Sequence, residues 1–185
     1  MATKDIVFIA LFAAIIAALG LLPAIPVVGI PAPITAQTLG VMLAGAILGP
    51  KRGALAVLVF LVLVLAGLPL LAGGRGGIEH FIGNSGGFLV GWFFGAYVIG
   101  FILKNFISDT QVNIRAHFII FIACFLGGIC VVYLPGILWI ARNTGSSFVD
   151  VYLGSLVFIP GDLLKAIVAM LVTVAVRRVY PIALK

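Results

Sequence analysis

Length, composition and charge exclude an ordinary water-soluble domain. The chain has 185 residues, of which 64% are hydrophobic and only 9% are charged, and its mean hydropathy is +1.36. A soluble domain carries about 25% charged residues, because polar side chains must cover its surface. Part of the surface of this protein must therefore be in contact with lipid. The net charge of +6 is explained by basic loops beside anionic lipid, so nucleic acid is not an expected partner.

The apolar segments predict an all-α integral membrane protein, a single domain of six transmembrane helices over residues 1–185. A spanning helix needs roughly 17 to 25 apolar residues. The second span is short and contains Gln37, so we expect it to be tilted, broken or packed inside the bundle. We interpret the first span as a retained helix, because Lys4 is the only basic residue before it and five apolar spans follow. The predicted spans are residues 6–22, 34–49, 53–71, 84–103, 116–141 and 151–176.

The basic residues predict that both termini are cytoplasmic, because positively charged loops stay inside during insertion. In that orientation, Arg75 and Arg142 are the only two basic residues outside, and Lys165 lies within a span. The other eight of the eleven are cytoplasmic: Lys4, Lys51, Arg52, Lys104, Arg115, Arg177, Arg178 and Lys185.

No metal, disulfide or nucleotide site is expected. Cys124 and Cys130 share one apolar span, where their spacing puts them about 9 Å apart along a helix axis and on different faces. His80 and His117 are isolated from other metal-ligating residues. The phosphate-binding pattern G-x-x-x-x-G-K-[ST] is missing, so any ATP use has to come from a partner.

The sixth predicted span carries the strongest chemical signal. Asp162 and Lys165 lie among otherwise uncharged residues, where an ionisable side chain costs on the order of 2.5 to 3.5 kcal/mol. Their spacing puts both on one helix face, and Pro160 and Gly161 favour a bend just before them. We interpret the pair as the floor of a pocket with one acceptor and one cationic donor. An ion pair that only joins helices is the alternative.

The outer loop between the third and fourth spans is rich in glycine and contains Arg75, Glu79 and His80. Glycine lets backbone N–H groups converge on an anion, and a guanidinium offers a fork of donors suited to a carboxylate. We expect a flexible lid over a ligand. A tight turn between helices is the alternative.

The first outer loop, residues 23–38, contains four prolines and no charge. Prolines exclude a helix and favour an extended chain. We expect this apolar, irregular segment to cover the pocket while Thr35, Gln37 and Thr38 supply hydrogen bonds. A stiff apolar connector is the alternative.

Four motifs follow one another along nearly the whole chain: PITAQTLG at 33–40, LGPKRG at 48–53, AGGRGG at 72–77 and PGDLLK at 160–165. Together they resemble the BioY family, which supplies the biotin-specific substrate-binding subunits of energy-coupling factor (ECF) transporters. The resemblance implies a six-helix subunit, not an enzyme, in the plasma membrane of a prokaryote. Such a subunit binds biotin from outside and topples to transfer it. It needs no cofactor of its own, because a transmembrane coupling subunit and two cytoplasmic ATPases energise it.

The resemblance also assigns residues. The family's polar binding residues map onto Asn84, Asp162 and Lys165. We expect Asp162 to accept from a ureido N–H, while Asn84 and Lys165 donate to polar oxygens. Arg75 or loop N–H groups hold the carboxylate, or Lys165 does if the ligand lies the other way up, and Gln37 adds a hydrogen bond. Aromatic side chains near the outer side are expected to pack against the apolar part of biotin: Phe88, Trp92 and Tyr152.

A face for the coupling subunit is expected on the first helix, where small residues at every fourth position allow close approach of another helix. The sequence leaves open which of two rows faces the partner. One row is Ala10, Ala14 and Ala18, and the other is Ala13 and Ala17.

Two other classes of function stay open. The segment 83–86, GNSG, fits the G-x-S-G pattern of rhomboid intramembrane proteases, with Ser85 as nucleophile. The sixth span offers no histidine as base, which leaves only a dyad with Lys165. A self-sufficient secondary carrier for biotin or a similar small carboxylate is the other class, weakened because the two halves share no pattern of broken helices.

Overall fold

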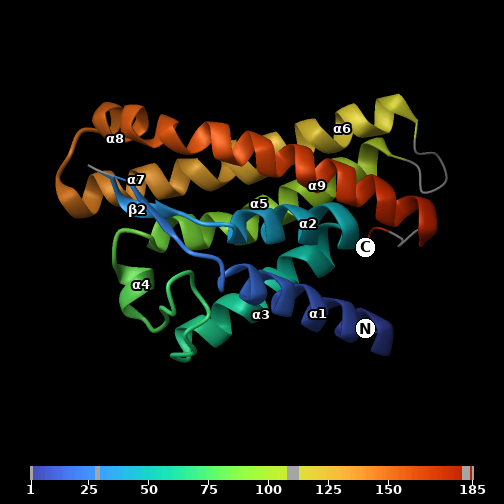
Figure 1. The fold of residues 1–185 in the computed structure, drawn as a ribbon, viewed down its shortest axis with the longest axis horizontal. Helices are drawn as coiled ribbons and strands as arrows, with labels where there is room; N and C mark the ends of the chain where they lie inside the picture. The colour runs from blue at the N-terminus through green and yellow to red at the C-terminus, as the bar shows by residue number, and fades with distance from the viewer. Residues whose placement is uncertain (1, 28–29, 108–112, 181–183, 185) are drawn as a thin grey trace.

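The computed structural model describes residues 2–27, 30–107, 113–180 and 184. The chain is mostly helical, and its long helices run along one common axis (Figure 1). Helices in chain order are α1 (Thr3–Leu19), α2 (Gln37–Leu48), α3 (Pro50–Leu65), α4 (Glu79–Ile82), α5 (Gly86–Phe106), α6 (Ile114–Phe125), α7 (Val132–Thr144), α8 (Phe148–Ser155) and α9 (Ile159–Val179). One π-helical turn, η1 (Leu126–Val131), joins α6 to α7, and one 3₁₀ turn, η2 (Leu156–Phe158), joins α8 to α9.

Within the described residues, three continuous helical stretches are long and apolar enough to cross a membrane: Gly86–Phe106, Ile114–Thr144 and Phe148–Val179. They correspond to the last three predicted spans, which confirms an integral membrane protein. The remaining predicted spans coincide with shorter helices of 17, 12 and 16 residues. The third of these begins at Pro50 and ends at Leu65, earlier than the predicted 53–71. Gly67 follows with φ +98°, a conformation that ends the helix.

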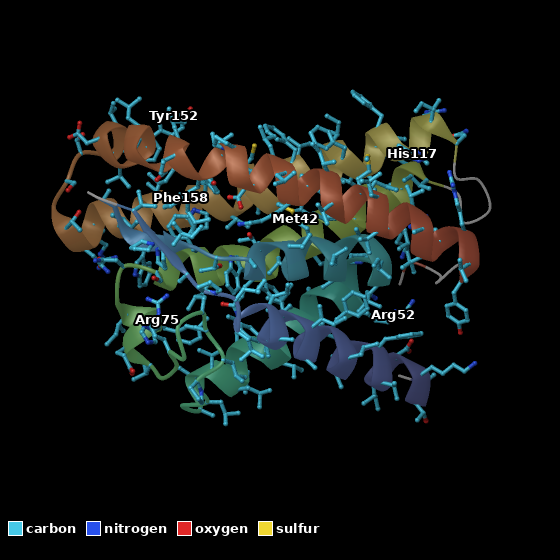
Figure 2. The ribbon with its side chains drawn as sticks, in the orientation of Figure 1. Met42, Arg52, Arg75, His117, Tyr152 and Phe158 are labelled. Atoms are coloured by element: carbon cyan, nitrogen blue, oxygen red, sulfur yellow. The ribbon has the colours of Figure 1, made fainter. Side chains whose placement is uncertain are left out.

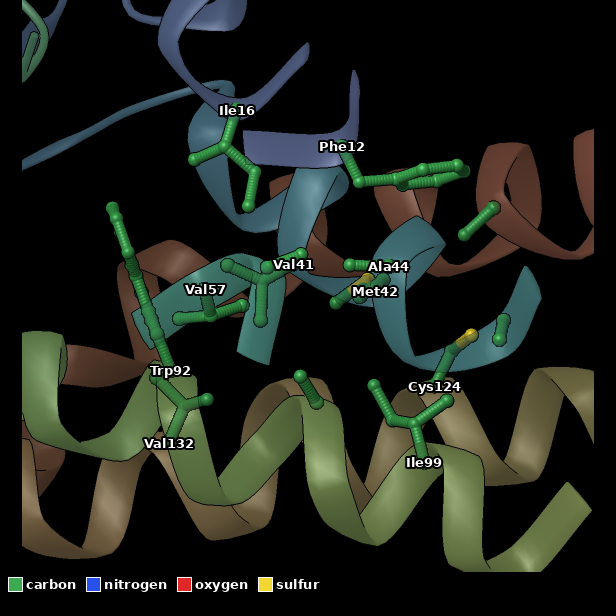
Figure 3. Close-up of a cluster of buried hydrophobic side chains, with 14 of the residues drawn as sticks. Phe12, Ile16, Val41, Met42, Ala44, Val57, Trp92, Ile99, Cys124 and Val132 are labelled. Carbon is green, nitrogen blue, oxygen red and sulfur yellow. The ribbon is translucent and has the colours of Figure 1, made fainter. Parts of the chain in front are cut away.

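Helix α2 lies at the centre of the bundle, which is one of the arrangements expected for this short span with Gln37. Nine of its twelve residues are buried. Figure 3 shows Val41 and Met42 of α2 between Ile16 of α1 on one side and Ile99 of α5 on the other. A helix surrounded by protein does not have to match the thickness of the bilayer, so it can be short.

The first outer loop is more ordered than predicted. Strands β1 (Ile25–Val27) and β2 (Ile30–Ile34) pair antiparallel, with Ile25 opposite Ile34. The expectation of an extended chain is confirmed, but the segment is a paired hairpin rather than the irregular segment that was expected. Residues 32–35 line the cavity described below. Strand pairing satisfies backbone groups that an isolated extended segment would leave without partners. In the part of the chain that the structure describes, the named elements other than this hairpin are helical.

The two ends of the helix bundle carry different parts of the chain. The N-terminus and the end of α9 lie at one end, whereas the hairpin and α4 lie at the other (Figure 1). Arg52 and His117 lie at the end with the termini, and Arg75 lies at the opposite end (Figure 2). Arg52 Nη1 lies 3.2 Å from Asp5 Oδ1, which joins the first turns of α1 and α3 through a buried ion pair.

Candidate substrate-binding site

A cavity of about 690 Å³, counting the space at its open side, lies among the hairpin, the glycine-rich loop and the helices. Sites for small molecules are mostly apolar, with a few polar groups that orient the ligand. This cavity has that character. The residues that line it are Ala32, Pro33, Ile34, Thr35, Gln37, Thr38, Leu71, Ala72, Arg75, His80, Ser85, Phe88, Leu89, Trp92, Val132, Tyr133, Phe158, Asp162 and Lys165.

The predicted charged pair lies in the wall of the cavity. Lys165 Nζ is 2.8 Å from Asp162 Oδ1, and the two side chains are only 15% and 7% exposed. Both project from the first turns of α9, directly after the 3₁₀ turn η2. The interruption lies where Pro160 predicted a bend, and Pro160 occupies the first turn of α9, where a missing N–H costs nothing.

Helix α2 and its preceding loop complete the coordination of Lys165. The ammonium group donates to Thr35 O at 2.6 Å and to Thr38 Oγ1 at 2.9 Å, besides Asp162. Thr38 Oγ1 in turn donates to Asp162 Oδ1 at 3.3 Å. The three ammonium protons thus have three acceptors. The positive charge is therefore compensated, and the orientation of the Lys165 side chain is fixed.

Tyr133 supplies a further partner of the carboxylate that the sequence did not indicate. Its hydroxyl donates to Asp162 Oδ2 at 2.5 Å. The only signal available was a phenol within an apolar span, which is also common in ordinary cores. The pairing depends on two helices 29 residues apart in sequence, so it became visible only in the fold.

Three aromatic rings form one wall of the cavity. Phe88, Tyr133 and Phe158 pack edge to face, with centroids 6.0 to 6.5 Å apart. Phe88 can reach this position because Gly136 of α7 has no side chain, and a Cβ there would lie 2.5 Å from the Phe88 ring. Trp92 also lines the cavity and contacts Phe60. Of the aromatic residues expected there, Phe88 and Trp92 are at the cavity.

Gln37 lines the cavity, but its side chain is already engaged. It is fully buried, and its Nε2 donates to Ile16 O at 3.1 Å and to Leu70 O at 3.0 Å. Its Oε1 accepts from Ala72 N at 3.0 Å. The amide therefore ties α1, α2 and the glycine-rich loop together, which is a positioning role.

The glycine-rich loop forms a tight turn whose residues also face the cavity. Leu71 and Arg75 pair through two backbone hydrogen bonds, and Gly73 and Gly74 turn the chain with φ of +82° and +68°. Arg75 Nε donates to Ala72 O at 2.9 Å. The structure shows the tight turn that was the alternative interpretation of this loop, and the turn brings Arg75 to the cavity.

Two expected residues lie elsewhere. Tyr152 is 47% exposed and stacks on Phe148, on the outer side of α8 (Figure 2), so the expectation that it lines the site does not agree with the fold. Asn84 is half-buried in the turn before α5. Within the described part of the chain, the cavity lining includes its neighbour Ser85 and not Asn84 itself.

Comparison with known proteins identifies the family. The sequence model of the BioY family matches residues 1–182. The chain belongs to the BioY family. A protein from Rhizobium etli named "Biotin transporter BioY" is 50% identical over 182 residues, which cover 98% of this chain and 97% of the relative. A protein of the same name from Rhodobacter capsulatus is 45% identical over 190 residues, with 98% and 97% coverage.

Among solved structures, the crystal structure of "the S-component for biotin from an ECF-type ABC transporter" superposes with a TM-score of 0.90 at 38% identity. The match covers 96% of this chain and 95% of that one. The family predicted from the four sequence motifs is therefore confirmed.

Membership of the BioY family makes this chain a transporter component rather than a serine protease. The geometry agrees with that assignment. Ser85 and Lys165 both line the cavity, but the ammonium protons of Lys165 are bound by Thr35, Thr38 and Asp162. An amine held in this way cannot take a proton from a serine.

The two alanine rows of α1 point in different directions. Ala13 is buried and Ala17 is half-buried, so this row packs inside the bundle. The other row, Ala10, Ala14 and Ala18, is exposed. The fold thereby separates two rows that the sequence could not distinguish.

Proposed function

We propose that this chain captures biotin in the described cavity and serves as the substrate-binding subunit of an ECF-type ABC importer. One observation carries the proposal: a compensated carboxylate and ammonium, Asp162 and Lys165, line a mostly apolar cavity in a chain of the BioY family. Biotin has the matching chemistry. Its ureido ring donates and accepts hydrogen bonds, its thiophane ring and valeryl chain are apolar, and its tail is a carboxylate.

The ligand lies with its ureido ring at Asp162 and its carboxylate at Arg75. Lys165 already binds three acceptors. In the part of the chain that the structure describes, the hydrogen bonds of the Arg75 side chain engage Nε alone. Its terminal amino groups therefore offer the fork of donors that suits a carboxylate. The rings of Phe88 and Trp92 pack against the apolar middle of the ligand, and Asn84 turns toward it when the site is filled.

The chain crosses the plasma membrane of a prokaryote six times, with both termini in the cytoplasm. The distribution of basic residues supports this topology. Arg52 lies at the end of the bundle that holds the termini, whereas Arg75 lies at the end with the hairpin (Figure 2). The cavity then faces the outside, where a captured vitamin enters.

The exposed row Ala10, Ala14 and Ala18 contacts the transmembrane coupling subunit, which joins two cytoplasmic ATPases. Small exposed side chains let another helix approach closely. Three surrounding residues of α1, Ile6, Val7 and Leu11, are also at least half exposed, which gives this face an apolar rim. Ala13 and Ala17 contribute to the packing of the subunit itself.

Equilibrium binding of biotin to the purified, detergent-solubilised chain tests the proposal. We expect saturable binding that Asp162→Asn abolishes. Asp150→Asn is the matched control, since Asp150 makes the same kind of hydrogen bond with Ser147 at the exposed start of α8. A folded wild-type chain that binds no biotin would refute the proposed ligand.

Reconstitution in liposomes separates the importer subunit from a self-sufficient carrier. The chain alone should bind biotin at the membrane without accumulating it inside. Addition of the coupling subunit, the ATPases and ATP should start uptake. Uptake by the chain alone, without ATP, would instead establish the secondary carrier.

A further inference from the structure

Tyr133 is the cavity residue whose place in the site the sequence did not indicate. Its side chain lies at the start of α7, and the residue is 8% exposed. Phe88 and Phe158 hold its ring edge to face, with centroids at 6.0 and 6.3 Å. Because two rings clamp the phenol, the oxygen stays in place, while the proton can still rotate about the C–O bond.

The hydrogen bonds of Asp162 determine where a ligand donor can enter. Oδ1 already accepts from Lys165 and from Thr38, and Oδ2 accepts from Tyr133. An ionised carboxylate oxygen accepts about two hydrogen bonds. The free position is therefore on Oδ2, directly beside the Tyr133 hydroxyl, which lies 2.5 Å away.

A cyclic urea presents an N–H donor and a C=O acceptor next to each other on one edge. Asp162 Oδ2 and the Tyr133 hydroxyl present the complementary order, an acceptor beside a donor. Such a pair can bind both groups of the edge at once. This chemistry rests on the proposed function, because it needs a ureido ligand in the cavity.

We propose that Tyr133 is a specificity-determining residue whose hydroxyl turns from Asp162 Oδ2 to the ureido carbonyl oxygen when the ligand enters. The ligand N–H then replaces the phenol proton on Oδ2. No acceptor is left without a donor, since Oδ2 exchanges one donor for another and the carbonyl oxygen gains the proton that Oδ2 released. The exchange lets the site stay satisfied when it is empty and when it is filled.

A prediction about ligand choice follows from this exchange. Sulfur is a weak acceptor, so an analogue with a ureido C=S in place of C=O gives the Tyr133 proton no good partner. The proton then stays on Asp162, so the thiourea gains no hydrogen bond from Tyr133. A site that hydrogen-bonds a carbonyl discriminates against such an analogue.

The experiment compares biotin with its thiourea analogue on three purified chains: wild type, Tyr133→Phe and Tyr97→Phe. Tyr133→Phe keeps the ring and removes only the hydroxyl. Tyr97→Phe is the matched control, because Tyr97 lies exposed on α5 and stacks on Phe101. In Tyr133→Phe we expect biotin affinity to fall about tenfold and affinity for the thiourea to change little, so that the preference for biotin disappears.

A purely structural role predicts a different pattern. If Tyr133 only orients Asp162, Tyr133→Phe weakens both ligands by the same factor and the preference remains, which overturns the proposal. An unchanged affinity for both ligands overturns it as well. If the wild-type chain binds neither ligand, the proposed function fails and this inference fails with it. If the wild-type chain binds biotin, the proposed function stands, and the comparison with Tyr133→Phe then tests the role of Tyr133 alone.

Infrared spectroscopy gives a readout that does not depend on affinity. The ureido carbonyl band of ¹³C-labelled biotin should lie at lower wavenumber on wild type than on Tyr133→Phe at saturating protein, because a donated hydrogen bond weakens the C=O bond. Equal band positions on the two proteins would contradict the donation.

Discussion

Lys165→Met removes a buried ammonium group that holds three acceptors at 2.6, 2.9 and 2.8 Å. The methionine fills a similar volume but leaves the Asp162 carboxylate without its cation. Removing one partner of a buried ion pair costs about 3 to 5 kcal/mol. Solvent screening reduces this energy only slightly, because the Lys165 and Asp162 side chains are 15% and 7% exposed. We therefore expect a clear fall in the unfolding temperature of the detergent-solubilised chain.

Biotin affinity should fall as well. Lys165 holds in place the Asp162 carboxylate to which the ureido N–H is proposed to donate. A hydrogen bond to a charged group contributes about 1.5 to 3 kcal/mol, so disturbing this one should lower the affinity by up to roughly 10- to 100-fold. The double variant Asp162→Asn with Lys165→Met separates the two effects. It restores neutrality, so most of the lost stability should return. Its biotin affinity should stay low, because the ureido N–H has lost its charged acceptor at position 162.

The assay is equilibrium dialysis with labelled biotin beside thermal unfolding of the same samples. Lys104→Met is the control, since it makes the same chemical change at an exposed position of α5 and should alter neither quantity. A double variant that binds biotin as tightly as wild type would refute the reasoning. The pair would then serve only to join α9 to α2.

Five further substitutions test the packing of the fold and the proposed partner face of α1. Gln37→Leu leaves a buried carbonyl and a buried amide without partners, so the free energy of unfolding should fall by about 2 to 6 kcal/mol, measured by thermal unfolding. Gly87→Ala places a methyl group against a backbone carbonyl and a tryptophan of α7, which should cost about 1 to 3 kcal/mol. Gly161→Ala, which meets no atom within 4 Å, should not destabilise the chain. Ala14→Leu should preserve biotin binding but abolish uptake with the coupling subunit, whereas Ala13→Leu should destabilise the subunit itself.

Each of these expectations has an opposing result. Unchanged stability of the Gln37 variant would mean that its three hydrogen bonds contribute nothing net. Equal stability of the two glycine variants would show that α5 and α7 can separate without cost. Normal uptake by the Ala14 variant would remove the exposed alanine row from the partner interface.

The sequence by itself determined that this protein lies in a lipid bilayer and that its charged pair is in the sixth predicted span. Whether a helix is stable in lipid depends on the summed hydropathy of its consecutive residues. Each long apolar segment could therefore be recognised from its own sequence. Asp162 and Lys165 stood out for the same reason, because an ionisable residue in an apolar helix needs a compensating environment. The proline beside them predicted the interruption that η2 provides.

The tertiary structure decided which faces of these helices meet. Val151 and Ser155 are the buried residues of α8, and Tyr152, one position on, points about 100° away from Val151. The alanine rows of α1 differ in the same way. A helical sequence states which residues share a face, but packing against other helices decides which face is inside.

Contacts between distant segments were also beyond the sequence. Tyr133 meets Asp162, and Gln37 meets Ala72, only because α2, α7, α9 and the glycine-rich loop converge on one cavity. Neither hydrogen bond leaves a mark in local periodicity, since each depends on the relative position of two elements. The same holds for the β hairpin, whose prolines excluded a helix but whose pairing required its two strands to come together.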